Sequence, residues 1–316
     1  MTGYVLTFGE TMGLFRAAEV GDLADVSDAR IGIGGADSNV AIGVSRLGAP
    51  AVWVGRVGDD GLGRRVVKEL RGEGVDVRAI VDPTARTGLM IKERRTPHTT
   101  RVSFYRADSA GSRLAPGDID ADLVRGASLL HVTGITASLS DSARELVRQV
   151  VAVARAAGVP VSFDVNHRPS LWPVGDASVV YRELAAESDI VFAGDDEAAL
   201  LTGLSPADPE ALARALVEHG PALAVIKRGA AGSLAFTEGT VTRQDALTVP
   251  VVDTVGAGDA FVAGFLRRRL DGAPIAECLE LAATAGAFAC MGPGDWESMP
   301  RTGDLRLLGG SDPVTR

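Results

Sequence analysis

Short, continuous apolar runs alternate with longer amphipathic stretches along most of the chain, and the alternation is most regular after Leu114. The apolar runs predict buried strands at 129–132, 159–164, 190–193 and 222–227. The amphipathic stretches predict helices at 140–157, 177–187, 197–201 and 209–218. Strands that are apolar at nearly every position and alternate with helices are typical of a parallel sheet covered on both faces. The pattern therefore predicts an α/β fold.

The N-terminal part follows the same alternation, with strands expected at 4–8, 51–57 and 75–81 and helices at 34–47 and 62–71. Two β-rich stretches, 11–33 and 86–106, interrupt it, and the second predicts a hairpin with a polar tip at 94–99. Such strands are expected to form a small separate sheet. We therefore expect a core of residues 1–10, 34–85 and 107–316 and a β lid of residues 11–33 and 86–106.

A glycine-rich turn occupies 253–259 near the C-terminus. A strand-like run at 247–252 leads into it, and helical patterns follow at 260–270 and, rich in alanine, at 274–291. The start of a helix leaves backbone N–H groups unpaired and carries partial positive charge. Gly256, Ala257 and Gly258 would let an anion approach that backbone, although the glycines alone are also compatible with a plain turn. Asp259 would then lie beside a bound phosphate, and we expect the helix start to lower the pKa of its carboxyl.

The composition excludes few functions, but it bears on the binding partners and the cellular location of the protein. The 316 residues are 46% hydrophobic and 23% charged, as in ordinary globular proteins. A net charge of −9 and an isoelectric point of about 5.0 disfavour a nucleic-acid or anionic-membrane binder. Cys278 and Cys290 show no C-x-x-C spacing, and neither a signal peptide nor a membrane-spanning stretch is evident. These features predict a cytoplasmic protein.

Two motifs more than two hundred residues apart resemble one known family. The string D-T-V-G-A-G-D-A-F at 253–261 resembles the C-terminal signature of the PfkB, or ribokinase-like, sugar kinases. The string G-G-A-D-S-N-V-A at 34–41, followed by Leu47-Gly48, resembles their N-terminal signature, which binds the sugar. The resemblance implies a three-layer αβα sandwich with a mostly parallel central sheet and a small β-sheet lid.

Within this family the chain resembles the 2-keto-3-deoxygluconate kinases in three stretches, 104–110, 163–172 and 294–297. These place Arg106 and Arg168 near the acid sugar and the phosphates, and arginine pairs a carboxylate through two parallel hydrogen bonds. Met90 and Phe104 stand where these kinases often have tyrosines, and Gly194 replaces the asparagine of an N-x-x-E motif. These departures leave the identity of the sugar open.

The resemblance assigns further roles. The residues expected to bind substrate are Gly34, Gly35, Asp37, Asn39, Met90, Phe104, Arg106, Arg168, Asp259 and Asp295. Those expected to bind the nucleotide are Asn166, Arg168, Lys227, Gly229, Gly232, Gly256, Gly258 and Ala283. Glu197 is expected to act on Mg²⁺ through water. His131 is expected to be structural, whereas His167 adjoins Arg168 and is a weaker candidate for ligand contact.

The resemblance thus implies a kinase that uses ATP and Mg²⁺ to phosphorylate the terminal hydroxyl of 2-keto-3-deoxygluconate, with Asp259 as the base. A monovalent cation remains open as a further cofactor, and the resemblance implies a homo-oligomer, since exposed lid strands often pair between subunits in this family. One alternative is a kinase for a neutral sugar, of the fructokinase or ribokinase type. Another is a sugar- or nucleotide-binding regulator without catalysis. An NAD-dependent dehydrogenase is disfavoured because G-x-G-x-x-G is absent.

Overall fold

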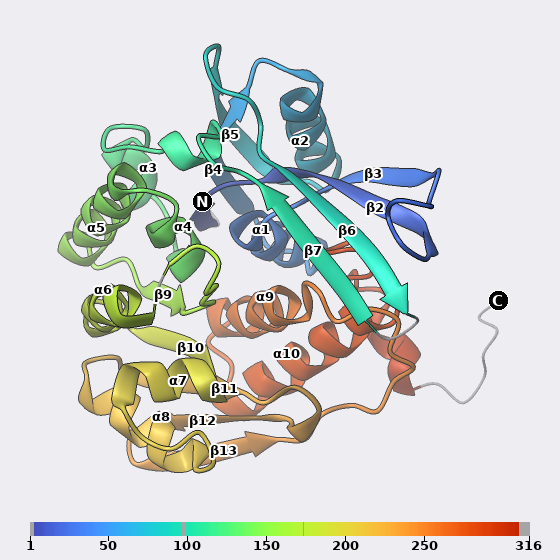
Figure 1. Cartoon of the computed structure of the whole chain (residues 1–316). Helices are drawn as coiled ribbons and strands as arrows, with labels where there is room; N and C mark the ends of the chain where they lie inside the picture. Colours follow the sequence, from blue (N-terminus) through green and yellow to red (C-terminus); the bar gives the residue numbers. More distant parts are fainter. Residues whose placement is uncertain (1–2, 97–98, 173, 310–316) are drawn as a thin grey trace.

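A nine-stranded sheet forms the centre of the protein, in the order β13-β12-β11-β10-β9-β8-β1-β4-β5 (Figure 1). The structure is a computed structural model that describes residues 3–96, 99–172 and 174–309. Neighbouring strands from β11 to β5 pair in parallel, and β12 and β13 are antiparallel. The strands are β1 (Val5–Phe8), β4 (Ala51–Gly58), β5 (Asp76–Asp82), β8 (Leu129–Thr133), β9 (Val161–Asp164), β10 (Ile190–Gly194), β11 (Leu223–Lys227), β12 (Ser233–Thr237) and β13 (Thr240–Gln244).

Helices cover both faces of this sheet, because successive strand residues point to opposite sides. In β10, the side chain of Phe192 packs on Phe265 of α9, whereas those of Val191 and Ala193 belong to the core on the other face. The first face carries α1 (Ala36–Arg46), α2 (Gly61–Gly72), α9 (Ala257–Leu270) and α10 (Ile275–Cys290). The second carries α3 (Ala121–Arg125), α4 (Gly134–Ser138), α5 (Asp141–Ala156), α6 (Val174–Ala186), α7 (Asp195–Thr202) and α8 (Pro209–Glu218). The predicted three-layer sandwich is confirmed.

A separate four-stranded sheet has the order β3-β2-β6-β7 and consists of β2 (Met12–Val20), β3 (Ala29–Gly34), β6 (Leu89–Thr96) and β7 (Thr99–Tyr105). The parallel pairing of β2 with β6 joins the two β-rich stretches of the sequence. Met12, Leu14 and Met90 form its small apolar core. The tip expected at 94–99 includes residues 97 and 98, which lie outside the described residues. That this sheet works as a lid distinct from the core stays a prediction.

One predicted strand is wrong. Residues 247–252 form no strand, and the chain crosses from β13 to α9 as an irregular loop in which Val252 N–H donates to the carbonyl oxygen of Cys290. Pro250 lacks an N–H for a sheet ladder, and Leu247 and Val251 are exposed rather than packed in a sheet. The apolar pattern that suggested a strand has another origin, because these residues line a cavity.

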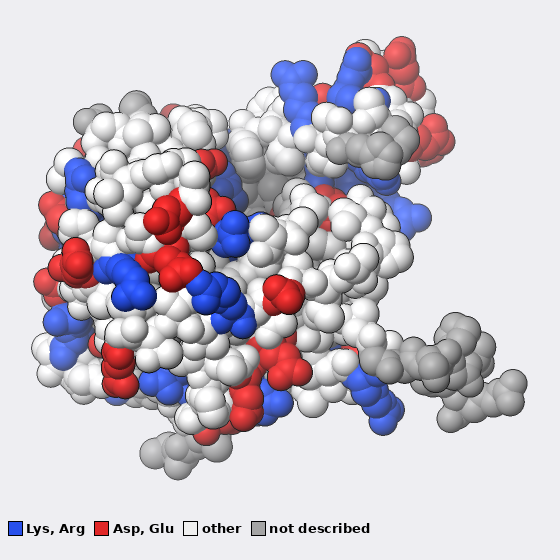
Figure 2. Space-filling model, turned by 90° about the horizontal axis from the view of Figure 1, so that it is seen from below, with Lys and Arg blue, Asp and Glu red and all other residues white. Residues whose placement is uncertain are grey.

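Charged side chains of both signs are interspersed on the face shown in Figure 2, so that face carries no continuous basic surface. In the described part of the chain, no helix combines the length and the apolar character needed to cross a bilayer. The expectations that nucleic acid and membranes are not partners stay predictions.

Candidate active site

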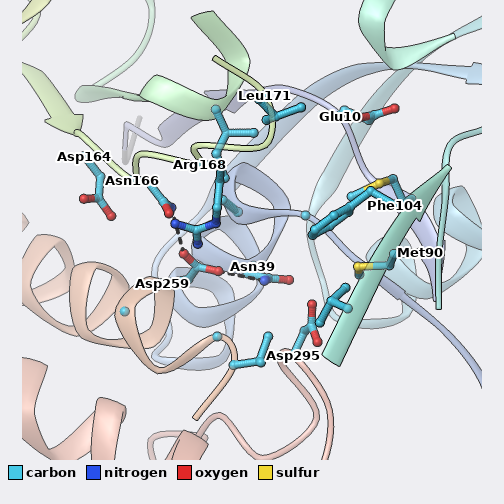
Figure 3. Close-up of a pocket in the computed structure, with 18 of the residues that line it drawn as sticks. Glu10, Asn39, Met90, Phe104, Asp164, Asn166, Arg168, Leu171, Asp259 and Asp295 are labelled. Carbon is cyan, nitrogen blue, oxygen red and sulfur yellow. Dashed lines mark hydrogen bonds between the residues drawn. The ribbon is translucent and has the colours of Figure 1, made fainter. Parts of the chain in front are cut away.

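A cavity of about 440 Å³ lies where the four-stranded sheet meets the carboxyl ends of the parallel strands (Figure 3). Ligands of open α/β sheets bind at this edge. The cavity brings together most of the predicted site residues, which come from segments far apart in the sequence: Gly35, Asn39, Met90, Phe104, Arg106, Asn166, Arg168, Glu197, Lys227, Gly256, Gly258, Asp259 and Asp295.

Asp259 lies buried in the first turn of α9, on the wall of this cavity. Its Oδ2 atom accepts a hydrogen bond from Asn39 Nδ2 at 2.7 Å, and its Oδ1 atom accepts from Asn166 Nδ2 at 3.5 Å (Figure 3). Burial raises the pKa of Asp259 to about 7, against the opposing effect of the Asn39 hydrogen bond, and the nearby Asp164 raises it further. The predicted lowering of this pKa is therefore wrong. Loss of hydration disfavours the carboxylate more than the helix start favours it.

Gly256 and Gly258 of the turn have different structural roles. Gly256 has a φ of 77°, and a Cβ atom there would overlap the backbone oxygen of Asp295. It is therefore needed for the close packing of the two loops rather than for approach of a ligand. A Cβ atom at Gly258 would find its nearest neighbour, Lys227 Nζ, only at 3.8 Å. Gly258 thus leaves open backbone at the helix start, where an anion is favoured.

A second cavity of about 550 Å³ adjoins the first. Lys227, Thr254 and Gly258 line both cavities, so two ligands bound side by side would meet at the start of α9. The second cavity is lined by three predicted nucleotide residues, Gly229, Gly232 and Ala283. Leu247, Val249 and Val251 of the irregular loop before α9 and Ala257 at the start of α9 also line it. Its apolar walls suit a flat, largely apolar group such as a nucleobase.

Carboxylates near the shared wall are held by specific partners. Asp164, at the end of β9, accepts from Lys227 Nζ at 2.6 and 2.8 Å. Glu197 accepts the backbone N–H of His167 at 2.8 Å through Oε1 and that of Gly194 at 2.7 Å through Oε2. Glu197 therefore fixes the loop after β9 against the start of α7.

Two of these carboxylates are candidates for a Mg²⁺ site. No group of three or more potential ligand side chains capable of holding a metal occurs among the described residues. Mg²⁺ usually keeps several waters and takes one or two carboxylates together with substrate phosphates, so Asp164 and Glu197 fit such a site. The role of Glu197 stays a prediction.

Arg106 is already paired in the structure. Its guanidinium donates through Nε to Glu10 Oε2 at 2.7 Å and forms an ion pair with the same carboxylate through Nη2. The hydroxyl of Ser109 donates to Glu10 Oε1. Arg168 differs, because it is exposed and no carboxylate within residues 3–96, 99–172 and 174–309 lies at ion-pair distance from it. Arg168 is thus the arginine of the cavity that lacks a carboxylate partner.

Two predicted residues lie behind the cavity wall. Asp37 is 1% exposed, accepts hydrogen bonds from Thr133 and Thr136 at 3.1 and 2.8 Å, and does not line the cavity. Burial raises the pKa of Asp37 to about 7. Contact of Asp37 with sugar hydroxyls stays a prediction, and its Oδ1 atom is buried without a hydrogen-bond partner among the described residues. A Cβ atom at Gly34 would overlap Met90 and Asp295, so this glycine lets those side chains close the wall.

His131 and His167 lie in different surroundings. His131 is fully buried with Nδ1 at 3.0 Å from Ser162 Oγ, and burial lowers its pKa to about 3, as suits a structural histidine. His167 packs on Tyr181 and reaches its hydroxyl at 3.2 Å. Contact of His167 with a ligand stays a prediction.

Three residues that line the cavity were not assigned to the site by sequence reasoning: Glu10, Lys92 and Asp164. Glu10 follows β1, and Asp164 ends β9, so the rule that ligands bind at the carboxyl ends of parallel strands would have found both. Lys92 lies within strand β6 of the small sheet, and no local signal marks it.

The fold and the two adjoining cavities, with the buried carboxyl of Asp259 on the wall of the first, are features of an α/β enzyme with room for two ligands. The pattern of the pfkB family carbohydrate kinases matches residues 2–302. The chain is 38% identical over 301 residues to the 2-dehydro-3-deoxygluconokinase of Bacillus subtilis (strain 168), covering 93% of this chain and 92% of that protein. It is 34% identical over 316 residues to the 2-dehydro-3-deoxygalactonokinase of Haloferax volcanii, covering 97% and 99%.

A solved structure gives the same result. The sugar kinase of Pyrococcus horikoshii in complex with ATP superposes with a TM-score of 0.83 at 29% identity, covering 96% of this chain and 97% of that chain. The protein described here belongs to the pfkB family of carbohydrate kinases. The resemblance seen in the two sequence signatures is confirmed.

Proposed function

We propose that the protein is an ATP-dependent kinase that phosphorylates the terminal hydroxyl of 2-keto-3-deoxygluconate. The observation that carries the proposal is the position of Asp259, which lies buried beside Gly258 where the two cavities meet. A sugar in the first cavity and ATP in the second would bring a hydroxyl and a phosphoryl group to this carboxylate. Positioning of this kind supplies much of the rate in phosphoryl transfer.

The chemistry requires one proton acceptor and one anion-binding group. The sugar hydroxyl passes its proton to Asp259, its oxygen bonds to the γ-phosphorus, the bond from phosphorus to the β–γ bridging oxygen breaks, and ADP leaves. A carboxyl whose pKa is about 7 in the ligand-free site suits a base that works near neutral pH. The open backbone at Gly258 would stabilise charge on the transferred group.

The second ligand is proposed to be ATP with Mg²⁺. The apolar loop before α9 and Ala283 of α10 would hold the adenine, and Lys227 would face the phosphates. The ATP complex of the Pyrococcus horikoshii relative supports this assignment. Mg²⁺ would neutralise phosphate charge beside Asp164 and Glu197, and it enters with the nucleotide.

The assignment of an acid sugar as the substrate rests on the arginines of the cavity and on the names of the relatives. Arg168 lines the cavity, and its guanidinium donates to the backbone oxygen of His167 but has no carboxylate at ion-pair distance among the described residues. It would therefore offset the desolvation of a substrate carboxylate. The names of the Bacillus subtilis and Haloferax volcanii relatives support a 2-keto-3-deoxy sugar acid. The two thiols, both free of a disulfide, support a cytoplasmic location, and we keep a homo-oligomer as part of the proposal.

A neutral sugar is the second candidate, and one observation favours it. Glu10 already neutralises Arg106, and Met90 and Phe104 offer no hydroxyl to an acid sugar. Identification of the product separates the two candidates. Wild-type enzyme with ATP and 2-keto-3-deoxygluconate should yield ADP and a phosphate monoester on the terminal carbon, seen by phosphorus and carbon NMR. No such ester from the acid sugar, together with one from fructose or ribose, would exclude the proposed substrate.

A further inference from the structure

Lysine is rare in this chain, and two of its three lysines line the main cavity. Only three of the 32 basic residues are lysine, at positions 68, 92 and 227, and the others are arginine. Lys68 is exposed on α2, whereas Lys92 and Lys227 both line the main cavity. Lys227 has an expected role with the nucleotide. Lys92 has none, although its side chain is 1% exposed on strand β6 of the small sheet.

The ammonium group of Lys92 bridges two buried carboxylates from the C-terminal part of the chain. Its Nζ atom lies 2.6 Å from Asp253 Oδ2 and 3.3 Å from Asp295 Oδ1. Strand β6 reaches across the molecule toward these loops in Figure 1. A single cation therefore joins the small sheet, the turn before α9 and the loop that carries Asp295.

Each carboxylate holds one part of the site. Asp253 begins the glycine-rich turn, and its Oδ1 atom accepts the backbone N–H of Val255 at 3.2 Å. Asp295 lines the sugar cavity, and its backbone oxygen packs against Gly256 so closely that no Cβ atom fits. The Lys92 ammonium thus lies where it can fix the phosphate-binding turn and the cavity wall against each other.

Removing this charge would leave two buried carboxylates without their cation. Burial and the neighbouring Glu297 and Asp253 raise the pKa of Asp295, and Lys92 is the main influence that lowers it. Without the ammonium, these carboxyls would take up protons or move apart, because unpaired buried charge is costly. Either response disturbs the turn at Val255 and the position of Asp295.

We propose that Lys92 is a positioning residue that couples the small sheet to the phosphate-binding turn and to the sugar wall through Asp253 and Asp295. The phosphate site is then fully formed only while β6 lies over the cavity. The proposal rests on the proposed function for its kinetic consequence, because Asp253 holds the turn where the phosphoryl group would bind and Asp295 lines the cavity where the sugar would bind. Its structural consequence is independent of the sugar.

The test compares Lys92→Met with Lys92→Arg and with Lys68→Met as the matched surface control. Hydrogen–deuterium exchange of residues 253–258 in the ligand-free protein should be faster in Lys92→Met and unchanged in Lys68→Met. In ADP release, Lys92→Met should lower kcat about tenfold or more and raise the KM of the sugar, because it loosens groups on both sides of the reaction. Lys92→Arg keeps a cation and should restore most of kcat.

The outcomes are distinct. A lower melting temperature in Lys92→Met with normal exchange at 253–258 and normal kcat would overturn the proposal and leave a purely structural ion pair. Should Lys92→Met fail to fold, Asp253→Asn replaces it, since this change loses the ammonium contact but keeps an oxygen for Val255 N–H. Normal exchange and kcat in that variant would equally overturn the proposal. If wild type phosphorylates no acid sugar, the proposed substrate fails while the exchange result still decides the role of Lys92.

Discussion

The side chain of Asn39 donates a hydrogen bond of 2.7 Å to the carboxylate of Asp259 across 220 residues of sequence. This hydrogen bond joins α1, which starts within the N-terminal signature, to α9, which starts within the C-terminal signature. The Oδ1 atom of Asn39 is buried and has no hydrogen-bond partner among the described residues. A buried acceptor without a partner is costly, so a sugar hydroxyl that fills this position would be favoured. Asn39 thus orients the base and offers an acceptor to the substrate.

Asp259→Asn should lower kcat by about 10²–10⁴-fold, the range that a lost general base accounts for. The fold and the affinity for ATP should be retained, because the amide is close in shape to the carboxyl. Asp271→Asn, at the exposed C-terminal end of the same helix, is the matched control and should keep wild-type turnover. Kinetics and nucleotide titration measure both variants. Turnover above about a tenth of wild type in Asp259→Asn would remove Asp259 as the base.

The pH dependence of kcat/KM should report the raised pKa of Asp259. Only the ionised carboxylate accepts a proton, so kcat/KM for the sugar should fall as pH drops below about 7. The profile is measured at saturating ATP, with a buffer series of constant ionic strength. An acid limb at the ordinary aspartate pKa of 3.8 would contradict a base desolvated in the free enzyme.

The stability of the fold should depend on pH in the opposite sense to kcat/KM. A folded-state pKa of about 7 against an ordinary value of 3.8 means that folded protein binds more protons between these values, so Asp259 destabilises the fold increasingly as pH rises through that window. Asp259→Asn removes the titrating carboxyl, so the variant does not lose this stability as pH rises. The melting temperature of the variant relative to wild type should therefore increase from about pH 4 to about pH 8, in the absence of ligands. Parallel curves for the two proteins would show that Asp259 titrates normally.

The two glycines of the turn should respond differently to alanine. Gly256→Ala places a Cβ atom on the backbone oxygen of Asp295 at a positive φ, so it should lower the melting temperature and raise the KM of the sugar. Gly258→Ala meets open space and should leave the fold intact while lowering kcat or raising the KM of ATP. Equal effects on stability, or normal kinetics in Gly258→Ala, would remove the assignment of Gly258 to the phosphate.

Sequence reasoning succeeded where local pattern carries the signal. The apolar strands around Val191 and the glycine-rich helix start at Gly256 both follow from residue order alone. It failed at 247–252, because apolar side chains that line a cavity look the same in sequence as those of a buried strand. It also failed on the pKa of Asp259, since burial depends on how the small sheet and α1 close over the site. The partners of Arg106 and Lys92 were missed for the same reason.

The substrate class is the central claim, and Arg106 gives its sharpest test. Removing this guanidinium leaves the buried carboxylate of Glu10 facing the cavity without its partner, so an anionic sugar meets repulsion that a neutral one does not. Losing a charge-assisted pair typically costs a few kcal/mol, or about a hundredfold in kcat/KM. Arg106→Ala with Glu10→Gln is the control, and it should recover part of the loss because the repelling charge is gone.

The decisive measurement is kcat/KM by coupled ADP release for 2-keto-3-deoxygluconate and for fructose, in wild type and in Arg106→Ala. We expect wild type to prefer the acid sugar and Arg106→Ala to lower kcat/KM for it about a hundredfold more than for fructose. Preference of wild type for fructose, or an equal loss for both sugars in Arg106→Ala, would contradict the acid-sugar assignment and leave a kinase for a neutral sugar in its place.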